Sequence, residues 1–268
     1  MLKDIPVLLQ TQMPSFADHF VSAISIIKAG DDRDPPGDHH GTGSFVFLEG
    51  DKFVLTCEHV ARFQKTAMLG MTQFGAQFAV SIPGAFSLVE YPIDIAVSFI
   101  PDKNWGLVSH TAKCVDLEMF AKKHEPVEGE YLYVYGFPGD DAVTGFGQHH
   151  HRGLAVLSHE QAFSEILNQE IPTPLENYHF CIPYNPEHAI LLDGQDPLLS
   201  KPPGMSGSLV WNTRYVEVTS QGREWSPEDA RVTGVVWGHS TKASVLIATR
   251  VEFVRYYLSI DNELNGVE

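Results

Sequence analysis

Three residues of this chain have the types and the order needed for nucleophilic attack on a carbonyl group. Ser206 lies between two glycines in the turn 204–208, which reads Gly-Met-Ser-Gly-Ser. Such a turn presents a hydroxyl for attack and aims its own N–H groups at the oxyanion that forms. A serine hydroxyl is a weak nucleophile and needs a base, usually histidine, within hydrogen-bond reach. His59 and Asp94 lie upstream and supply a base and a carboxylate to orient it.

The order of these residues separates the hydrolase classes. α/β-Hydrolases run Ser, Asp, His and subtilisins run Asp, His, Ser, whereas this chain runs His, Asp, Ser. With the motifs around it, the chain resembles the trypsin/chymotrypsin-like serine peptidases. Residues 55–60 (Leu-Thr-Cys-Glu-His-Val) are similar to that family's Leu-Thr-Ala-Ala-His motif, and residues 94–97 (Asp-Ile-Ala-Val) to its Asp-Leu-Ala-Leu motif.

Further segments with family character follow in the right order, so that the resemblance covers residues 18 to 258. These segments are 41–46 (Gly-Thr-Gly-Ser-Phe-Val), 135–139 (Tyr-Gly-Phe-Pro-Gly) and 234–238 (Gly-Val-Val-Trp-Gly). The resemblance implies an all-β fold of two six-stranded antiparallel barrels with a C-terminal helix. The domains expected are an N-terminal extension (1–17), a first barrel with His59 and Asp94 (18–110), an interdomain connection (111–129), and a second barrel with Ser206 and the helix (130–268).

The distribution of apolar residues independently favours an all-β chain. Many short β-type runs are separated by Gly, Pro and Asp clusters, which is typical of a barrel or sandwich. The predicted strands are 20–27, 43–48, 53–56, 78–82, 95–100, 131–135, 153–157, 178–182, 208–211, 232–237 and 244–248. Helical spacing predicts a helix over 160–169 and a closing helix over 251–258, and a short helix-compatible stretch covers 116–122.

By the resemblance, the chain is a serine endopeptidase that works through an acyl-enzyme. Ser206 attacks the scissile carbonyl, His59 takes its proton and later protonates the leaving amine, and Asp94 orients His59. The N–H groups of Gly204 and Ser206 form the oxyanion hole. The partner is a polypeptide substrate, and neither a cofactor nor a metal ion is expected.

The sequence departs from the family pattern at two positions. Met205 stands where the animal enzymes have an aspartate that pairs with a new N-terminus after zymogen cleavage. Because methionine cannot form that ion pair, any gating must come from elsewhere, such as an activating protein partner or a loop. Glu58 stands beside His59 where a small residue is usual, and strand alternation predicts that its side chain points away from the site.

The sequence defines the specificity pocket less well than it defines the three candidate catalytic residues. The resemblance places Ser200 at its base, and the absence of an aspartate there argues against a strong preference for Lys or Arg. Its walls would come from Trp237, Gly238 and either His239 or Ser240, and a one-residue slip in register would reverse which side chains face the pocket. A small or apolar preference is favoured, and a polar or acidic one stays open.

Other reactive residues have simpler interpretations. Cys57, two residues before His59, is expected to fill the core, as free cysteines often do. The histidines at 149–151 and 39–40 are expected to lie in solvated loops, because adjacent residues of a strand point to opposite sides and make a poor tetrahedral metal site. Whether the two groups meet in space stays open.

Composition excludes several classes of partner. The chain has 18 Lys and Arg against 34 Asp and Glu, a net charge of −16, which argues against nucleic acid or an anionic membrane surface as partner.

Three cysteines make no disulfide framework, which favours a reducing compartment. With no recognisable signal peptide and no apolar run near the roughly 20 residues that span a bilayer, a cytoplasmic location is expected.

Two alternatives to a peptidase remain on sequence alone. A catalytically silent or partner-activated peptide-binding module would keep the fold, although it has no physical need of all three catalytic residues and both glycines. A metal-dependent hydrolase would be built on the histidine clusters.

Overall fold

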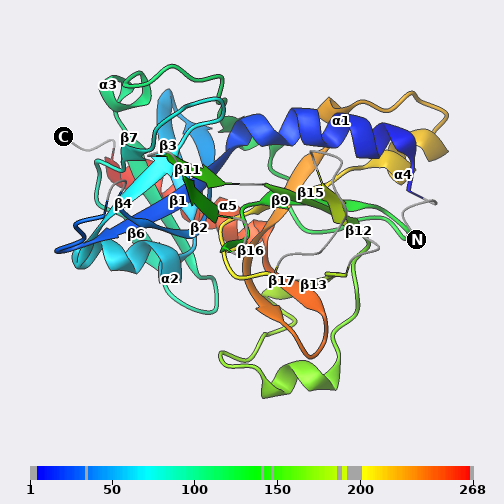
Figure 1. Ribbon diagram of the computed structural model, residues 1–268. Helices are drawn as coiled ribbons and strands as arrows, with labels where there is room; N and C mark the ends of the chain where they lie inside the picture. The colour runs from blue at the N-terminus through cyan, green and yellow to red at the C-terminus, as the bar shows by residue number, and fades with distance from the viewer. Residues whose placement is uncertain are drawn as a thin grey trace.

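The computed structural model describes residues 5–33, 36–139, 142–145, 148–151, 153–185, 189–191 and 201–265. Two curled, largely antiparallel sheets make up most of it, and a C-terminal helix packs against the second sheet (Figure 1). This is the architecture that the resemblance implies. Counted over the described residues, the sheets contain eight and seven strands, because short edge strands add to the main ones.

The first sheet carries the N-terminal half of the chain. Its strands follow the order β5-β4-β1-β2-β3-β7-β6, and β8 pairs in parallel with β2. The turn between β2 and β3 consists of Glu49 and Gly50, with φ of 49° and 101°, which is the geometry of a two-residue hairpin. The strands are β1 (Val21–Lys28), β2 (Asp38–Leu48), β3 (Asp51–Thr56), β4 (Ala67–Thr72), β5 (Val80–Ser81), β6 (Ser87–Val89), β7 (Ile95–Ile100) and β8 (Val115–Asp116).

The second sheet follows the order β13-β17-β16-β15-β9-β12-β14, and β10 and β11 form a separate two-stranded ladder. Strands β9, β12 and β15 are buried along their whole length, which explains their nearly continuous apolar sequences. The strands are β9 (Leu132–Gly136), β10 (Ala142–Gly145), β11 (Gln148–His151), β12 (Leu154–Ser158), β13 (His179–Pro183), β14 (Ala189–Leu191), β15 (Leu209–Asn212), β16 (Arg231–Ser240) and β17 (Val245–Arg250).

Among the described residues, five α-helices connect or cover the sheets. The closing helix expected over 251–258 is present and longer than predicted. The helices are α1 (Val7–Ala17), α2 (Glu58–Ala61), α3 (Asp102–Trp105), α4 (Tyr215–Ser220) and α5 (Val251–Asn265). No helix in the described part of the chain is long and apolar enough to cross a membrane.

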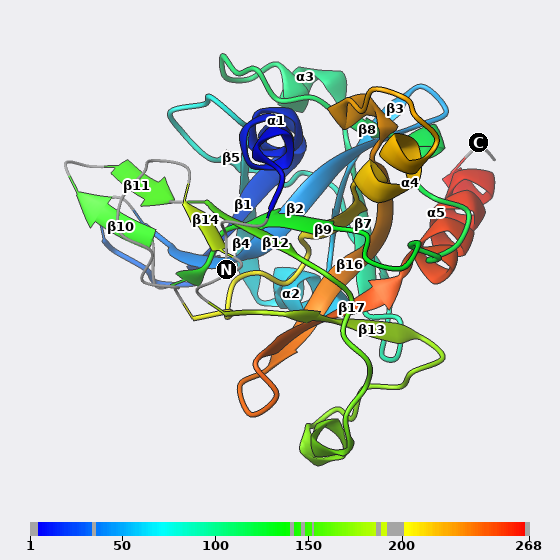
Figure 2. The same ribbon diagram turned by 90° about the vertical axis from the view of Figure 1, so that its right-hand side faces the viewer.

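Helix α1 forms within the segment that the sequence assigns to an N-terminal extension. Leu9 and Met13 on this helix are fully buried, and the Phe16 ring contacts the Trp211 ring of β15 edge-on at 5.5 Å. The helix lies above β9 and β15 in Figure 1 and is seen end-on in Figure 2. The segment is therefore part of the core rather than an appendage.

The helix predicted over 160–169 is largely wrong. Only Glu165–Gln169 is helical, as a 3-10 helix. The start of the segment pairs with the second sheet instead: Gln161 forms an antiparallel bridge with Cys181, and its N–H donates to the Cys181 carbonyl at 2.9 Å. The segment then extends away from the sheets (Figures 1 and 2).

Two other predicted elements are shorter than expected, and six of the described strands were not predicted: β4, β6, β8, β10, β11 and β14. The strand over 78–82 is reduced to Val80–Ser81, and the helix-compatible stretch over 116–122 contains only a 3-10 turn at Leu117–Met119. Strand β4 (Ala67–Thr72) is stabilised by its pairing with β1, although its own sequence, Ala-Met-Leu-Gly-Met-Thr, has weak β-propensity.

Burial of α1 leads to a stability prediction. Leu9→Ala should lower the free energy of unfolding by about 2–5 kcal/mol, because it leaves a cavity beneath the helix. The matched control is Leu8→Ala on the same helix, where the side chain is 43% exposed and the loss should be about 0.5 kcal/mol or less. Denaturant unfolding of both variants gives the values. Equal losses would show that α1 does not belong to the core.

Candidate active site

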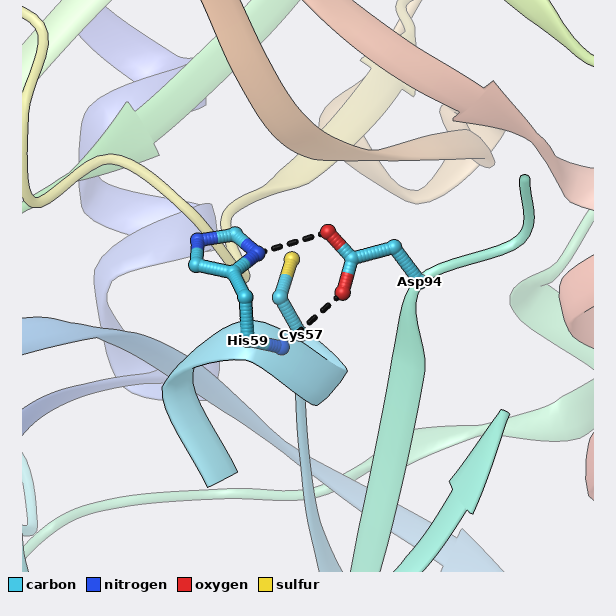
Figure 3. Close-up of side chains that lie close together, drawn as sticks. All are labelled: Cys57, His59 and Asp94. Carbon is cyan, nitrogen blue, oxygen red and sulfur yellow. Dashed lines mark hydrogen bonds and ion pairs between the residues drawn. The ribbon is translucent and has the colours of Figure 1, made fainter. Parts of the chain in front are cut away.

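His59 and Asp94 form a pair with defined orientation. The His59 Nδ1 lies 2.6 Å from Asp94 Oδ2, and the backbone N–H of His59 donates to Asp94 Oδ1 at 3.0 Å (Figure 3). Because a carboxylate only accepts hydrogen bonds, the ring proton sits on Nδ1. In the neutral imidazole, Nε2 is then the unprotonated nitrogen, which is the atom that a general base uses.

Local structure explains how these two residues meet. Strand β3 ends at Thr56, and helix α2 begins immediately afterwards, so His59 lies in the first turn of that helix. Asp94 precedes β7, the neighbour of β3, and adopts a left-handed φ of 52°. Aspartate tolerates this conformation better than most residues. Adjacent strands therefore deliver both side chains to the same edge of the first sheet.

Cys57 lies close to this pair. Its thiol donates to the Val236 carbonyl at 3.2 Å and is fully buried, and burial raises the pKa of the thiol well above its ordinary value. Its Sγ and the facing atoms of His59 and Asp94 lie within 4.8 Å of one another (Figure 3). Since the thiol stays protonated and the His59 Nδ1 is bonded to Asp94, Cys57 behaves as a core residue.

Ser206 lies on a turn whose backbone needs glycine on both sides. Gly204 and Gly207 have φ of 102° and 97°, a region that residues with a Cβ rarely adopt. A Cβ on Gly204 would lie 2.6 Å from the Phe137 carbonyl oxygen. The Ser206 hydroxyl donates to the Trp237 carbonyl at 3.2 Å and, within the described structure, forms no hydrogen bond with His59.

Met205 anchors the same turn by an apolar contact. Its side chain is 1% exposed and packs among the buried residues of the second sheet. A Cβ on Gly136 would lie 3.0 Å from the Met205 sulfur, so this glycine makes room for it. Apolar packing therefore takes the place of the ion pair that the family's aspartate would form.

Thr42 of the first sheet binds the Ser206 turn from the opposite side. Its hydroxyl donates to the Gly204 carbonyl at 2.7 Å, and its backbone N–H donates to the Ser206 carbonyl at 2.9 Å. The same hydroxyl accepts from the Phe137 N–H at 3.0 Å, which joins two segments of the second half of the chain. The turn that belongs to the second sheet is thus held by β2 of the first.

The predicted site residues of both sheets share one cleft of about 500 Å³. Ser200, predicted at the base of the specificity pocket, lies outside the described residues. The predicted residues that line the cleft are His59, Asp94, Gly204, Ser206, Trp237, Gly238 and His239.

Glu58 differs from the prediction. It lies on helix α2 rather than on a strand, so strand alternation does not apply, and it lines the cleft instead of pointing away. The Arg62 guanidinium, one helical turn later, lies 4.0 Å from its carboxylate. This cation offsets the added negative charge near His59.

Several cleft residues were missed because they come from loops far apart in sequence. Tyr91 precedes the Asp94 turn, and its hydroxyl donates to the Thr173 carbonyl. Glu170 accepts a hydrogen bond from the Ser240 hydroxyl at 2.7 Å, and its neighbour Ile171 is 97% exposed at the cleft rim. Clusters of Pro and Gly mark such loops but do not indicate which surface they cover.

The histidines considered for a metal site are engaged in other contacts where the structure describes them. His39 bonds to the Phe137 carbonyl at 2.7 Å, and burial lowers its pKa to about 4. His40 bonds to the Val60 carbonyl at 3.1 Å. The side chains of residues 149–151 lie outside the described part of the chain.

Comparison with known proteins gives structural likeness only. No family model matches the sequence, and no curated protein matches it significantly. The Rv3671c protease of M. tuberculosis in its active form is 17% identical with a TM-score of 0.51, over 95% of this chain and 86% of that one. The scabies mite inactivated protease paralogue S-I1 is 14% identical with a TM-score of 0.53, over 92% of this chain and 96% of that one.

These likenesses show the fold. The chain has the fold of the trypsin/chymotrypsin-like serine proteases, as the sequence motifs predicted. One of the two similar structures is an active protease and the other an inactivated paralogue, so the fold by itself does not decide whether Ser206 reacts.

The Ser206 turn gives a test of its own geometry. Gly204→Ala and Gly222→Ala both place a Cβ at positive φ, which costs about 1–2 kcal/mol. Gly222 has open space around it, whereas Gly204 faces the Phe137 and Gly139 backbone. Gly204→Ala should therefore lower the free energy of unfolding by about 1–3 kcal/mol more than Gly222→Ala. Indistinguishable denaturation curves for the two variants would contradict the described turn.

Proposed function

We propose that the protein is a serine endopeptidase with His59, Asp94 and Ser206 as its catalytic residues. The observation that carries this proposal is the oriented His59–Asp94 pair, which shares a cleft with a serine on a turn of two positive-φ glycines. A base with a fixed tautomer and a hydroxyl in the same cleft are the two components that acyl transfer requires.

The proposed reaction proceeds in two halves. Ser206 Oγ attacks the scissile carbonyl carbon while His59 Nε2 takes the hydroxyl proton, and the carbonyl oxygen becomes an oxyanion. The intermediate collapses to an acyl-enzyme, and His59 gives the proton to the leaving amine. Water then attacks the ester, again through His59, which releases the acid and restores Ser206. Asp94 stabilises the imidazolium in both halves.

Backbone hydrogen bonding supports Gly204 and Ser206 as the oxyanion-hole donors. The N–H groups of Met205, Gly207 and Ser208 donate to the carbonyls of residues 202, 236 and 205. By contrast, the N–H groups of Gly204 and Ser206 donate to no acceptor among the described residues. Free N–H groups on alternate residues of a tight turn can converge on one oxygen, which is the arrangement that stabilises an oxyanion.

The resting position of Ser206 requires a rotation before attack. Its hydroxyl donates to the Trp237 carbonyl. In the proposed mechanism, rotation about the Cα–Cβ bond brings the hydroxyl to His59 Nε2. Rotation between staggered side-chain positions is fast compared with typical turnover. Catalytic hydrogen bonds are often absent without substrate and form in the complex.

The cleft favours a small or apolar side chain before the scissile bond. Trp237 and Gly238 provide an apolar wall. Burial lowers the pKa of His239 below its ordinary 6.5, while Glu170 acts in the opposite direction, so its ring is neutral above that pH. A neutral imidazole offers no fixed charge to bind a substrate carboxylate.

A catalytically silent or partner-activated peptide-binding module is the second candidate. The bond from Ser206 to the Trp237 carbonyl favours it, because a hydroxyl held there is not in contact with its base. Digestion of a peptide library by the pure protein, repeated with cell extract, separates the two forms of this candidate. Cleavage only with extract indicates an activating protein partner, and binding without cleavage in both indicates a silent module.

A cytoplasmic location accompanies the proposed function. All three cysteines of the chain are free thiols, two of them buried. Unpaired thiols are typical of proteins in reducing compartments.

Covalent labelling tests the proposed nucleophile. A fluorophosphonate reagent should modify the wild-type protein, and Ser206→Ala should abolish the modification, as read by intact-mass spectrometry. Asp94→Asn should slow labelling by about 10⁴-fold, because His59 loses its tautomer and orientation. The matched control is Ser208→Ala, which removes a buried hydroxyl from the same turn and should label normally. Undiminished labelling of Ser206→Ala would overturn the assignment.

The neutrality of His239 leads to a prediction about substrate preference. At pH 7.5, peptides with Ala or Val before the scissile bond should be cleaved about tenfold or more faster than peptides with Asp or Glu there. His239→Ala should leave that ratio nearly unchanged. Measured kcat/KM values that favour Glu in the wild type, with the preference lost in His239→Ala, would show that the ring is a charged ligand.

A further inference from the structure

We infer that His179 and Thr249, two residues of the second sheet, are positioning residues that hold the Asp94 turn in the first sheet. The inference rests on the proposed function, in which Asp94 orients His59. Neither residue touches the reacting atoms; both act through the backbone that precedes Asp94.

The Asp94 turn is short and held by few bonds of its own. The N–H groups of Ile93 and Asp94 both donate to the Glu90 carbonyl, at 3.2 Å each. Asp94 itself is 6% exposed and has the left-handed φ of 52°. A non-glycine residue keeps such a conformation only where its surroundings determine it.

His179 on β13 supplies the first external contact. Its Nε2 lies 2.7 Å from the Pro92 carbonyl oxygen, and its Nδ1 accepts the Leu175 N–H at 2.9 Å. Since Nδ1 accepts, the proton is on Nε2, which donates to Pro92. Burial lowers the pKa of His179 to about 4, so the neutral donor form persists across the physiological range.

Thr249 on β17 supplies the second contact. Its hydroxyl donates to the Ile93 carbonyl at 2.8 Å. Thr249 and His179 are opposite each other in the antiparallel pairing of β13 and β17, and both are fully buried. One cross-strand pair therefore donates to two consecutive carbonyls, Pro92 and Ile93, immediately before Asp94.

This pair also contacts the substrate cleft. The ring centroids of His179 and Trp237 lie 4.9 Å apart, and those of His179 and Tyr91 lie 5.9 Å apart. Trp237 and Tyr91 both line the cleft. The buried His179 ring therefore supports both the turn that carries Asp94 and the cleft wall at Trp237.

Matched variants separate positioning from general stability. Thr249→Val removes only the hydroxyl, and His179→Asn keeps an acceptor for Leu175 but is too short to reach Pro92. Thr249→Ser and His179→Gln restore a donor at each place. The control is Thr233→Val on β16, which removes an equally buried hydroxyl that contacts His124 rather than the Asp94 turn.

The expected results follow from the loss of Asp94 orientation. Thr249→Val and His179→Asn should lower kcat by about 10- to 100-fold with little change in KM, as misplacement of about 1 Å does. Thr249→Ser and His179→Gln should recover most of it, and Thr233→Val should keep wild-type kcat despite a lower melting temperature. In proton NMR spectra, the low-field signal of the His59 Nδ1 proton shared with Asp94 should weaken or broaden only in the first two variants.

Two results would overturn the inference: unchanged kcat and NMR signal in Thr249→Val and His179→Asn, or equal losses in Thr233→Val. The NMR measurement needs no turnover, so it tests the positioning role even in a protein without peptidase activity. Absence of labelling at Ser206 in the wild type would instead count against the proposed function. If His179→Asn does not fold, the isosteric Thr249→Val and its serine counterpart decide the question.

Discussion

Hydrogen bonds across the boundary between the two sheets hold both halves of the candidate site. Thr42, from the first sheet, binds the carbonyls of Gly204 and Ser206 on a turn of the second. His179 and Thr249, from the second sheet, bind the carbonyls of Pro92 and Ile93 beside Asp94 in the first. Each sheet therefore fixes the loop that the other contributes. A buried polar network of this kind is costly if one member is missing, so the geometry of the site depends on complete docking of the sheets.

The geometry of the site also depends on the backbone conformation of the Ser206 turn. Gly204 and Gly207 have positive φ, and in this turn the N–H groups of Gly204 and Ser206 donate to no acceptor among the described residues. Because Gly204 has no Cβ, the Phe137 carbonyl can lie close to it. Met205 holds this turn by burial, where the trypsin-like pattern has an aspartate. Apolar packing is insensitive to the charge of an N-terminus, so the turn needs no proteolytic cleavage to be anchored. In the proposed mechanism, the Ser206 hydroxyl is the group of the site that must change its hydrogen-bond partner before attack.

The sequence predicted the candidate catalytic residues better than it predicted the residues that line the cleft. His59, Asp94 and Ser206 stand in short motifs with local signatures, and the motifs fix their strand context. Most core strands also followed from alternation and turn residues. Helix α1 was missed because Pro14 lies within it and because its apolar residues gain stability from tertiary packing, as the contact of Phe16 with Trp211 illustrates. Tyr91, Glu170, His179 and Thr249 carry no local signature, since their roles arise from contacts between segments distant along the chain. Glu58 was misplaced because β3 ends two residues earlier than strand alternation assumed.

In the proposed mechanism, Ser206 moves from the Trp237 carbonyl to attack a carbonyl carbon beside the Gly204 and Ser206 N–H groups, which donate to no acceptor among the described residues. A crystal structure of the protein with a peptide boronic acid tests this directly, because boron forms a tetrahedral adduct with a reactive serine. We predict a bond from Ser206 Oγ to boron, one boronate oxygen within hydrogen-bond distance of the Gly204 and Ser206 N–H groups, and loss of the hydroxyl contact to Trp237. A peptide seated in the cleft with Ser206 still bonded to the Trp237 carbonyl and no adduct would contradict it, and would favour a binding module.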